Sequence, residues 1–466
     1  MIETITAVNQ AVNQFIWGVP AMVCIIGVGL LLSVRTGFLQ IRKFPYAIRT
    51  TIGRMFRKKD ASDGTMTPFQ AVCTALAATV GTGNIAGVAG AIAIGGPGAV
   101  FWMWCSALLG MCTKFSEVTL AVHFRERNKN GELVGGPMYY IKNGLGQRWQ
   151  FLAVLYSLFG VLTVFGTGNA TQVNTIVTAI DSAVLAYNTS VKSFLPTLNL
   201  IVGVVVAMLV AMVLLGGIKR IGSVTEKLVP VMAALYLLGG LVVLVCRIRY
   251  LPEAVGMIFR YAFVPNAIIG GSLGYALKMA VSQGVKRGLF SNEAGMGSTP
   301  HAHAMAKVKR PHEQGVVAMT GVFIDTFVVL TMTALVVIST LYAGNGILSA
   351  GAAEGVSKAN MAQLAFGTVL GSRAGSMFVA VCLLFFAFST ILSWNFFGRL
   401  NVSWLLGEKA VGVYSVLAIG FIFLGSCLSN DLVWELADLF NQLMVLPNVL
   451  ALVTLGGLVA AACRRK

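Results

Sequence analysis

Runs of apolar residues long enough to cross a membrane recur along this chain, and they constrain its fold more than any other feature. A run of 18 or more residues with few charges is typical of a transmembrane helix. About eleven such spans can be drawn, at roughly 15–34, 68–94, 98–121, 151–180, 197–216, 222–246, 268–289, 313–342, 375–399, 410–428 and 442–462. Only 11% of the 466 residues are charged, against about 25% in soluble domains. The sequence therefore predicts an all-α integral membrane protein.

The formal net charge of +17 predicts the orientation of the chain rather than a nucleic-acid partner. Membrane proteins concentrate Lys and Arg in their cytoplasmic connections, and the connection over residues 35–60 is strongly basic. We therefore place it in the cytoplasm and the N-terminus outside. Eleven spans then put the C-terminus, which ends in Arg464, Arg465 and Lys466, inside. The segment 247–260 carries three arginines on the predicted outer side, and we interpret it as interfacial.

The N-terminus and the cysteines narrow the class further. No Lys or Arg precedes Arg35, so the basic start of a signal peptide is missing and we expect the first run to be retained as a helix. The eight cysteines occur singly, without a CxxC pair. This spacing supports neither a disulfide framework nor a zinc site.

Eleven spans divide into one plus five plus five. We predict an extra N-terminal helix with its basic connection over 1–66, a first five-helix repeat over 67–250, and a second, inverted repeat over 251–466. In transporters built this way, glycine-interrupted segments at corresponding positions of the two halves point to the binding site. The first helix of half one contains TVGTGNIAGVAG (79–90), and the first helix of half two contains MAVSQGVKRG (279–288).

The segment 79–90 has three interpretations. Gly81, Gly83 and Gly87 resemble a dinucleotide loop, but that motif must follow a strand and this one lies within a membrane span. Gly83 and Gly87 also form GxxxG, which is typical of close helix packing but leaves the threonines and the asparagine unexplained. Gly81 and Gly83 each weaken a helix by about 1 kcal/mol relative to alanine. This favours a helix that is broken inside the membrane, which is compatible with a packing role for Gly87.

A broken helix at membrane depth requires a polar cavity or site. N–H groups freed at Thr82 and Gly83 can bind an anionic group, as helix N-termini do. Carbonyl groups freed at Ala77 and Val80, with the side chain of Asn84, can coordinate a cation such as sodium. A zwitterionic amino acid bound beside a sodium ion would satisfy both ends of the break.

Several long motifs carry a family resemblance: GTGNIAGV, GGPGAVFWMW followed by GMCTKFSE, GGPMYYI, and RGLFSNEAGMGSTP. They resemble the sodium:alanine/glycine symporter family, and the resemblance runs from Arg35 through the last span. It implies the leucine-transporter fold and a multi-pass position in the cell membrane, the inner or plasma membrane. It also implies cotransport of a small neutral amino acid, alanine or glycine, with sodium. We expect no cofactor beyond this ion and no obligatory protein partner.

Span four places Phe165, Asn169 and Gln172 at i, i+4 and i+7, which is one face of a regular helix. Amide side chains within a span can simply hold helices together. The resemblance implies that this helix faces the substrate. We therefore expect Phe165 to form an apolar wall, with Asn169 and Gln172 as hydrogen-bonding candidates and Gln172 the stronger of the two.

Span seven is expected to be unwound at Ser282–Gln283–Gly284, where the resemblance places the centre of the site. Met279, Ser282 and Gln283 are then expected to approach the substrate. Lys278 either snorkels or pairs with an acid, and it stays unassigned. Asn292 and Glu293, at the predicted cytoplasmic mouth, form either an inner gate or ordinary loop structure.

Span nine carries the adjacent hydroxyls Ser389 and Thr390. Hydroxyls in spans often bond only to the preceding backbone turn. The resemblance implies instead that they serve the central sodium site, opposite the carbonyls of Ala77 and Val80. Trp394 is then expected to line the side-chain pocket, leaving room for alanine or glycine.

Asp325 is the acid nearest the middle of the membrane. Intramembrane acids are functional candidates, so it either joins a second cation site near Asn84 and Thr326, carries a proton, or makes a structural polar contact, for example with Lys278. Glu117 and Lys114 are expected to form a structural pair.

The predicted mechanism is alternating access about a site in the middle of the membrane. Proton coupling or a preference for glutamine is the alternative, and an ion channel is a further one. The polar residues cluster at mid-span in non-equivalent helices, which argues against a channel. The sequence lacks both a nucleophile–base pair and a metal-ligand cluster, so we do not expect an enzyme.

Overall fold

The computed structural model describes residues 19–55, 66–129, 131–264, 273–349, 355–428 and 430–464. Within these ranges the chain is almost entirely helical, and its strands are β1 (Glu126–Arg127) and β2 (Leu133–Val134), paired antiparallel. The predicted all-α class is confirmed. Arg465 and Lys466, the start of the first predicted span and residues 56–60 of the basic connection lie outside the described residues.

Seven segments of the described chain are long and apolar enough to cross a membrane. They are α7 (Ala99–His123), Gln147–Tyr187, Thr189–Leu214, α12 (Gly217–Cys246), Pro311–Tyr342, α19 (Ser372–Leu406) and Val433–Cys463. An eighth is formed if the bent pair Pro68–Thr79 and Gly83–Gly95 counts as one span. The chain is therefore a multi-pass membrane protein. The count of eleven, the two five-helix repeats and the orientation stay predictions.

Several of these segments are composite, and shorter helices connect them. The remaining elements are α2 (Val19–Arg35), α3 (Leu39–Arg42), α4 (Phe44–Met55), α5 (Pro68–Thr79), η1 (Gly83–Gly87), α6 (Val88–Gly95), α8 (Pro137–Tyr140), η2 (Ile141–Leu145), η3 (Gln147–Trp149), α9 (Gln150–Thr163), η4 (Val164–Ala170), α10 (Thr171–Tyr187), η5 (Thr189–Phe194), α11 (Leu195–Leu214), η6 (Ile248–Tyr250), α13 (Leu251–Phe263), α14 (Leu273–Asn292), α15 (Pro300–Ala304), α16 (Pro311–Phe323), η7 (Ile324–Leu330), α17 (Thr331–Val337), η8 (Ile338–Tyr342), α18 (Met361–Leu370), α20 (Ala410–Gly425) and α21 (Asn430–Arg464).

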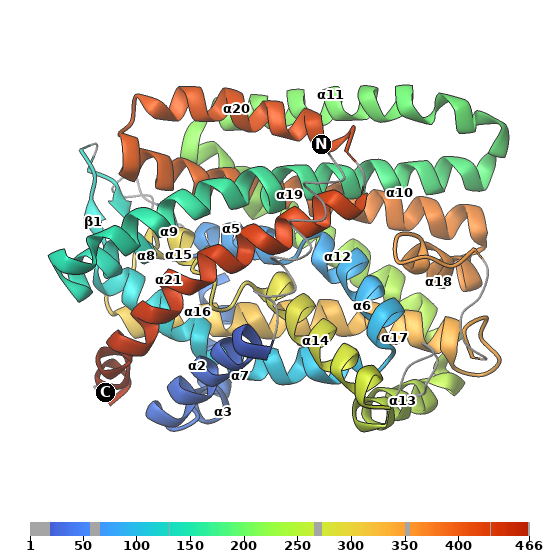
Figure 1. The fold of residues 1–466 in the computed structure, drawn as a ribbon, viewed down its shortest axis with the longest axis horizontal. Coiled ribbons are helices and arrows are strands. Elements are labelled where there is room, and N and C mark those ends of the chain that lie inside the picture. Colours follow the sequence, from blue (N-terminus) through green and yellow to red (C-terminus); the bar gives the residue numbers. More distant parts are fainter. Residues whose placement is uncertain are drawn as a thin grey trace.

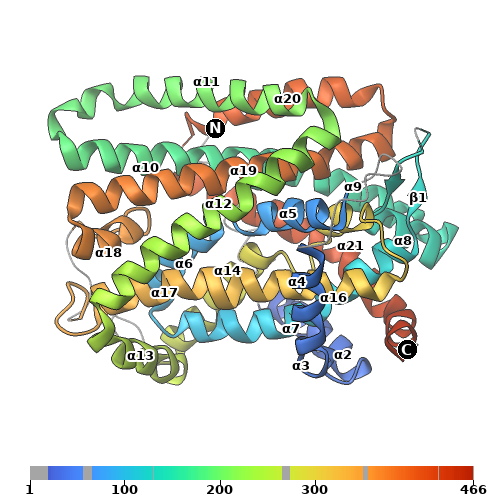
Figure 2. The ribbon, with the colours of Figure 1, turned by 180° about the vertical axis from the view of Figure 1, so that it is seen from behind.

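The long helices run roughly along the longest axis of the molecule (Figures 1 and 2). In both views α11 and α20 lie along one side, and α7 and α13 lie along the opposite side. The bent pair of α5 and α6 lies between them. α5 packs against α12 and α19, while α6 packs against α14, α7 and α17. The break between α5 and α6 is therefore enclosed by helices from both halves of the chain.

The predicted break at Ser282–Gln283–Gly284 is wrong, because α14 continues through these residues to Asn292. The glycine has another role. A Cβ atom at Gly284 would lie 2.5 Å from both the carbonyl oxygen of Ala99 and the Cβ of Trp102. Gly284 thus allows α14 to pack closely against α7, and small residues serve this purpose in membrane helices.

Candidate functional site

The first break separates α5 from η1 and bends the helix axis by 43°. α5 begins with a capping box, in which Thr67 and Gln70 exchange side-chain and backbone hydrogen bonds. It ends at Thr79, and Gly81 N–H donates to the side chain of Asn84 across 3.0 Å. Thr82 and Gly83 start the next helical piece, where N–H groups have no acceptor within the helix. The predicted break at this position is confirmed.

A second break lies at the end of α14, ten residues after the predicted position. Glu293 adopts a φ of 54°, and Gly295 and Gly297 have φ values of 95° and 74°. These left-handed conformations end the helix, and glycine adopts them at little cost. α15 starts at Pro300. The pattern of two glycines followed by a proline was the sequence signal for this break, and it lay within the quoted family motif.

Hydroxyl groups of α19 meet the end of α5. Thr390 Oγ1 donates to the carbonyl oxygen of Ala77 across 2.9 Å, and Ser389 Oγ lies 3.4 Å from the same oxygen. Both hydroxyls also contact the carbonyl oxygen of Phe386. Val80 is the C-cap of α5 and is buried. The structure thus brings the hydroxyls and the freed α5 carbonyl together, as predicted.

Asn84 and Asp325 form a second polar cluster on the other side of the break. Asn84 Nδ2 donates to Asp325 Oδ1 across 2.7 Å, while Ser291 and Thr326 donate to Asp325 Oδ2 across 2.8 and 3.0 Å. Asp325 and Asn84 are fully buried, whereas Lys278 is exposed. Asp325 is therefore held by neutral donors rather than by Lys278. Ser291 was missed because a contact across 34 residues has no local sequence signal.

The next contacts connect residues of both breaks around Thr82. We call this group, which contains Thr82, Gly83, Gln172, Ser291 and Trp394, the ring around Thr82. Thr82 Oγ1 donates to Gln172 Oε1 across 3.0 Å. A Cβ atom at Gly168, one turn before Gln172, would lie 2.5 Å from the Cβ of Trp394. A Cβ atom at Gly83 would lie 3.4 Å from the Cα of Ser291. Helices α10, α14 and α19 therefore converge on the break between α5 and η1.

Other predicted site residues face elsewhere. Phe165 stacks on Phe421 of α20 with a centroid separation of 4.6 Å. Asn169 donates to the carbonyl oxygen of Ala418, also on α20, and accepts from Asn395. Both residues therefore bridge neighbouring helices in the described structure, and the ring around Thr82 does not include them.

The three residues predicted on span seven lie on α14, roughly two and a half to three and a half turns before its end at Asn292. Met279 is near Gly95, because a Cβ atom added at Gly95 would lie 3.2 Å from the carbonyl oxygen of Met279. Ser282 and Gln283 are half-buried, and the buried Gln283 Oε1 has no hydrogen-bond partner among the described residues. All three residues are helical because α14 is unbroken at this point.

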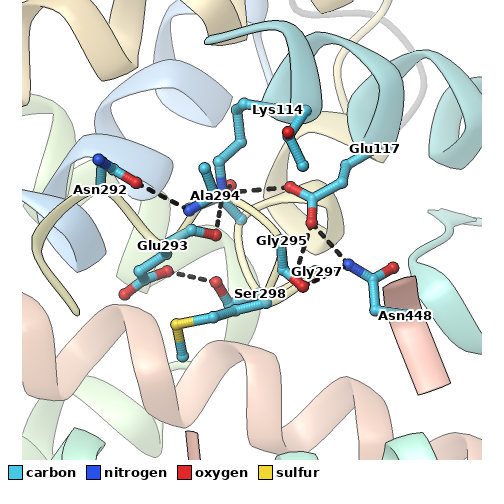
Figure 3. A network of polar contacts seen from close by, with 12 residues as sticks. Lys114, Glu117, Asn292, Glu293, Ala294, Gly295, Gly297, Ser298 and Asn448 are labelled. Carbon is cyan, nitrogen blue, oxygen red and sulfur yellow. Dashed lines mark hydrogen bonds and ion pairs between the residues drawn. The ribbon is translucent and has the colours of Figure 1, made fainter. Parts of the chain in front are cut away.

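Lys114 and Glu117 form the expected buried pair, with 3.4 Å between Nζ and Oε2. Lys114 also donates to the carbonyl oxygen of Glu293 across 2.6 Å, and Asn448 of α21 donates to Glu117 Oε1 across 2.6 Å (Figure 3). Gly297 N–H donates to the same Glu117 oxygen. The loop of the second break is thus fixed between α7 and α21.

A small cavity of about 70 Å³ lies one turn beyond Thr82 and Gly83. Gly87 and Gly90 line it on one side, Thr175 of α10 on another, and Arg287 and Trp434 on a third. Arg287 forms a two-point ion pair with Asp438 of α21, at 3.0 and 3.2 Å. The cavity therefore lies against η1 and α6, between α10, α14 and α21.

Comparisons with known proteins find relatives along nearly the whole chain. The sodium:alanine symporter family matches residues 2–465. An uncharacterized transporter of Haemophilus influenzae is 44% identical over 97% of this chain and 94% of its own. The sodium/alanine symporter AgcS of Methanococcus maripaludis is 41% identical over 99% and 96%. A Bacillus subtilis protein named "probable sodium/glutamine symporter GlnT" is 35% identical over 97% and 88%.

Proposed function

Because the chain belongs to the sodium:alanine symporter family, and is thus a transporter rather than an enzyme, we propose that it imports alanine or glycine with sodium across the cell membrane. We further propose the architecture of one extra helix and two inverted five-helix repeats, with the N-terminus outside and the C-terminus inside. The two helix breaks support this plan, since each lies in the first helix of its proposed half.

The observation that carries the proposal is the contact between the α19 hydroxyls and the end of α5. Thr390, Ser389 and the carbonyl oxygen of Ala77 place three oxygens within hydrogen-bonding distance at a helix end inside the membrane. Sodium is a hard cation, and such cations favour carbonyl and hydroxyl oxygens as ligands. We assign the coupling sodium to Ala77, Val80, Ser389 and Thr390. Its binding would tie α19 to the broken helix.

We assign a second cation position to the cluster around Asp325. A buried carboxylate whose direct hydrogen-bond donors are all neutral is stabilised by a cation or by a proton. Ser291 and Thr326 supply hydroxyl oxygens beside Asp325, whereas Asn84 presents its Nδ2 to Asp325 and its oxygen to Gly81 N–H. Sodium or a proton at Asp325 would therefore connect the first break to η7 during transport.

For the substrate, the ring around Thr82 supports a small zwitterion. Its carboxylate would bind the freed amides of Thr82 and Gly83, with Gln172 beside them. Trp394 is 1% exposed and fills the space opposite, which favours alanine and glycine over larger side chains. Phe165, Asn169, Met279, Ser282 and Gln283 would act through packing around this site.

Alternating access would use the two breaks as flexible points, with one group of helices rocking against the other. One sodium ion that moves through ~100 mV gains about 2.3 kcal/mol. A tenfold sodium gradient adds about 1.4 kcal/mol. The total of about 3.7 kcal/mol supports several-hundredfold accumulation of the amino acid, so one sodium ion suffices for a concentrating transporter.

The test is uptake of labelled alanine into proteoliposomes. We expect saturable uptake that requires a sodium gradient and stops when potassium replaces sodium. Uptake driven only by a proton gradient would reassign the coupling ion. Stronger competition by glutamine than by alanine or glycine would reassign the substrate. Non-saturable ion flux without amino acid accumulation would indicate a channel and contradict the proposal.

A further inference from the structure

A second and larger cavity, of about 480 Å³, lies beside the end of α7, the start of α16 and the last turns of α21. Its lining residues, all from the described chain, include none of the ring around Thr82. In both views the start of α16 and the end of α21 lie at the same end of the molecule (Figures 1 and 2). α7 packs against both of these helices. The volume lies within the usual range of ligand pockets, about 300–1,000 Å³, and the proposed transport site does not use this space.

One wall of the cavity carries basic side chains. Arg310 is the N-cap of α16, His312 follows in the first turn of that helix, and His123 is the last residue of α7. The N-terminus of a helix adds a partial positive charge. None of the described residues that line the cavity is an acid, and Glu313 in the first turn of α16 is not among them. This wall therefore favours an anionic group.

The donors of this wall fit a phosphate group. Arg310 and His312 also make contacts within the protein, but a guanidinium has five N–H donors in a planar fork, which is more than one partner needs. This fork matches two phosphate oxygens at once. The imidazole of His123 donates one N–H when it is neutral and two when it is charged. Helix N-termini also bind phosphate through their N–H groups, so three kinds of donor meet at one wall.

The opposite wall of the cavity is apolar and belongs to a membrane span. It consists of Leu458, Val459, Ala461 and Ala462 of α21, which share one face of the helix because they are one, three and four residues apart. Leu458 is 46% exposed and Ala461 is exposed as well, and both lie within the span Val433–Cys463. Exposed side chains of a span face lipid chains. The ligand of this cavity therefore has an anionic end and an apolar end.

We propose that this cavity binds the head group of an anionic phospholipid. The phosphate accepts hydrogen bonds from Arg310 and the N-terminus of α16, and an acyl chain lies along α21 beside Leu458. In the proposed orientation the end of α21 is inside, so the lipid comes from the cytoplasmic leaflet, whose surface is negatively charged. Basic pockets between membrane helices on this side suit such head groups. The bound lipid ties α21 to α16, the helix that continues into η7 and Asp325.

The test is titration of the detergent-purified protein with phosphatidylglycerol and with phosphatidylcholine of the same acyl chains, followed by native mass spectrometry. Both lipids contain a phosphate, but only phosphatidylglycerol has a net negative charge. We expect one phosphatidylglycerol molecule to bind at least about tenfold more tightly than phosphatidylcholine. Arg310→Gln should weaken its binding about 10- to 100-fold, the usual effect of losing hydrogen bonds to a charged group. Equal affinities of the two lipids for the wild type would overturn the proposal.

Lys309→Gln is the matched control. Lys309 precedes Arg310 in the chain and is likewise exposed, but it does not line the cavity. Its replacement removes the same amount of charge, so phosphatidylglycerol binding should weaken by no more than about threefold. Equal losses in Lys309→Gln and Arg310→Gln would show that the lipid responds to the net charge of this surface and would refute a site in the cavity.

Ala461→Trp tests the apolar wall and leaves every charge in place. Because Ala461 is exposed, the larger side chain can be accommodated in the fold while it fills the space of the acyl chain. Phosphatidylglycerol binding should fall at least about fivefold, and wild-type binding would contradict the proposed position of the lipid.

A competition experiment separates a phospholipid from a soluble phosphate compound. Glycerol 3-phosphate has the phosphate but no acyl chain, so it should not displace phosphatidylglycerol from the wild type at equal concentration. Displacement would indicate a soluble ligand and overturn the proposal. Because these experiments measure lipid binding directly, their outcome does not depend on whether the protein transports alanine.

Discussion

Gly81 gives the sharpest test of how the first break is packed. A Cβ atom added at this position would collide with Thr390 Oγ1, the hydroxyl that donates to the carbonyl oxygen of Ala77. Its next contacts are ordinary, at 3.5 Å from Thr390 Cβ and 3.6 Å from the carbonyl oxygen of Ala78. The collision therefore involves one atom, and removing that atom should relieve it.

We expect Gly81→Ala to lower the free energy of unfolding by about 1–3 kcal/mol, the usual effect of overpacking a tight site. The double variant Gly81→Ala with Thr390→Ala should lose less than the sum of the two single variants. Contacting residues typically show coupling energies of about 0.5–3 kcal/mol. Gly87→Ala is the control, because the nearest atom to its Cβ would be the carbonyl oxygen of Thr82 at 4.0 Å.

The assay is unfolding of the purified protein in mixed detergent micelles, in buffer without sodium. Leaving out sodium matters because a ligand that binds the folded state would add its own stabilisation to variants that retain the site. Gly87→Ala should be neutral or slightly stabilising, since alanine is the better helix former. Additive effects of Gly81→Ala and Thr390→Ala, within about 0.5 kcal/mol, would show that the two residues do not meet as described.

Three further predictions concern packing and ion pairs. Gly284→Ala should destabilise the protein by about 1–3 kcal/mol, because the backbone of α7 lies against Gly284. Gly274→Ala is the control and should not destabilise the protein, because the space around Gly274 is open. Unfolding in detergent measures both variants, and equal effects would contradict the close packing of α14 against α7. Lys114→Met should cost about 3–5 kcal/mol because it leaves Glu117 buried and unpaired, and adding Glu117→Gln should recover part of this loss in the same assay. Arg287→Lys keeps the charge but loses the two-point ion pair with α21, so we expect a loss of about 1–2 kcal/mol, and an unchanged unfolding curve would argue against a stable pair.

Sequence patterns predicted features that depend on local composition. The apolar runs gave the membrane class, and the glycines of 79–90 located the first break. The cluster of Asn84 and Asp325 was also anticipated, although the residues are 241 positions apart. The sequence left this contact as one of several alternatives for Asp325, beside pairing with Lys278, and the structure shows the contact with Asn84.

The prediction for span four depended on the assumption of a regular helix. Phe165 and Gln172 share a face only at 3.6 residues per turn, but Val164–Ala170 form a π-helical segment. Its wider turns shift the register, so Phe165 faces α20 while Gln172 reaches Thr82. The sequence has no strong signal for such a segment.

The second break was misplaced because glycine has two uses. Gly284 serves close packing against α7, whereas Gly295 and Gly297 adopt left-handed conformations in the loop. Composition does not separate these roles, since both require the absence of a Cβ atom. The position of the neighbouring helix decides between them, and that position is known only from the fold.

The most direct test of the account is the sodium dependence of alanine uptake in Thr390→Ala. Thr390 Oγ1 lies 2.9 Å from the freed carbonyl of Ala77, and the loss of one oxygen ligand should raise the half-maximal sodium concentration about tenfold or more, with the order of competing amino acids unchanged. Ser415→Ala is the control, because its hydroxyl bonds to the preceding turn of α20 at Val411. Wild-type sodium activation in Thr390→Ala would contradict the proposed sodium site.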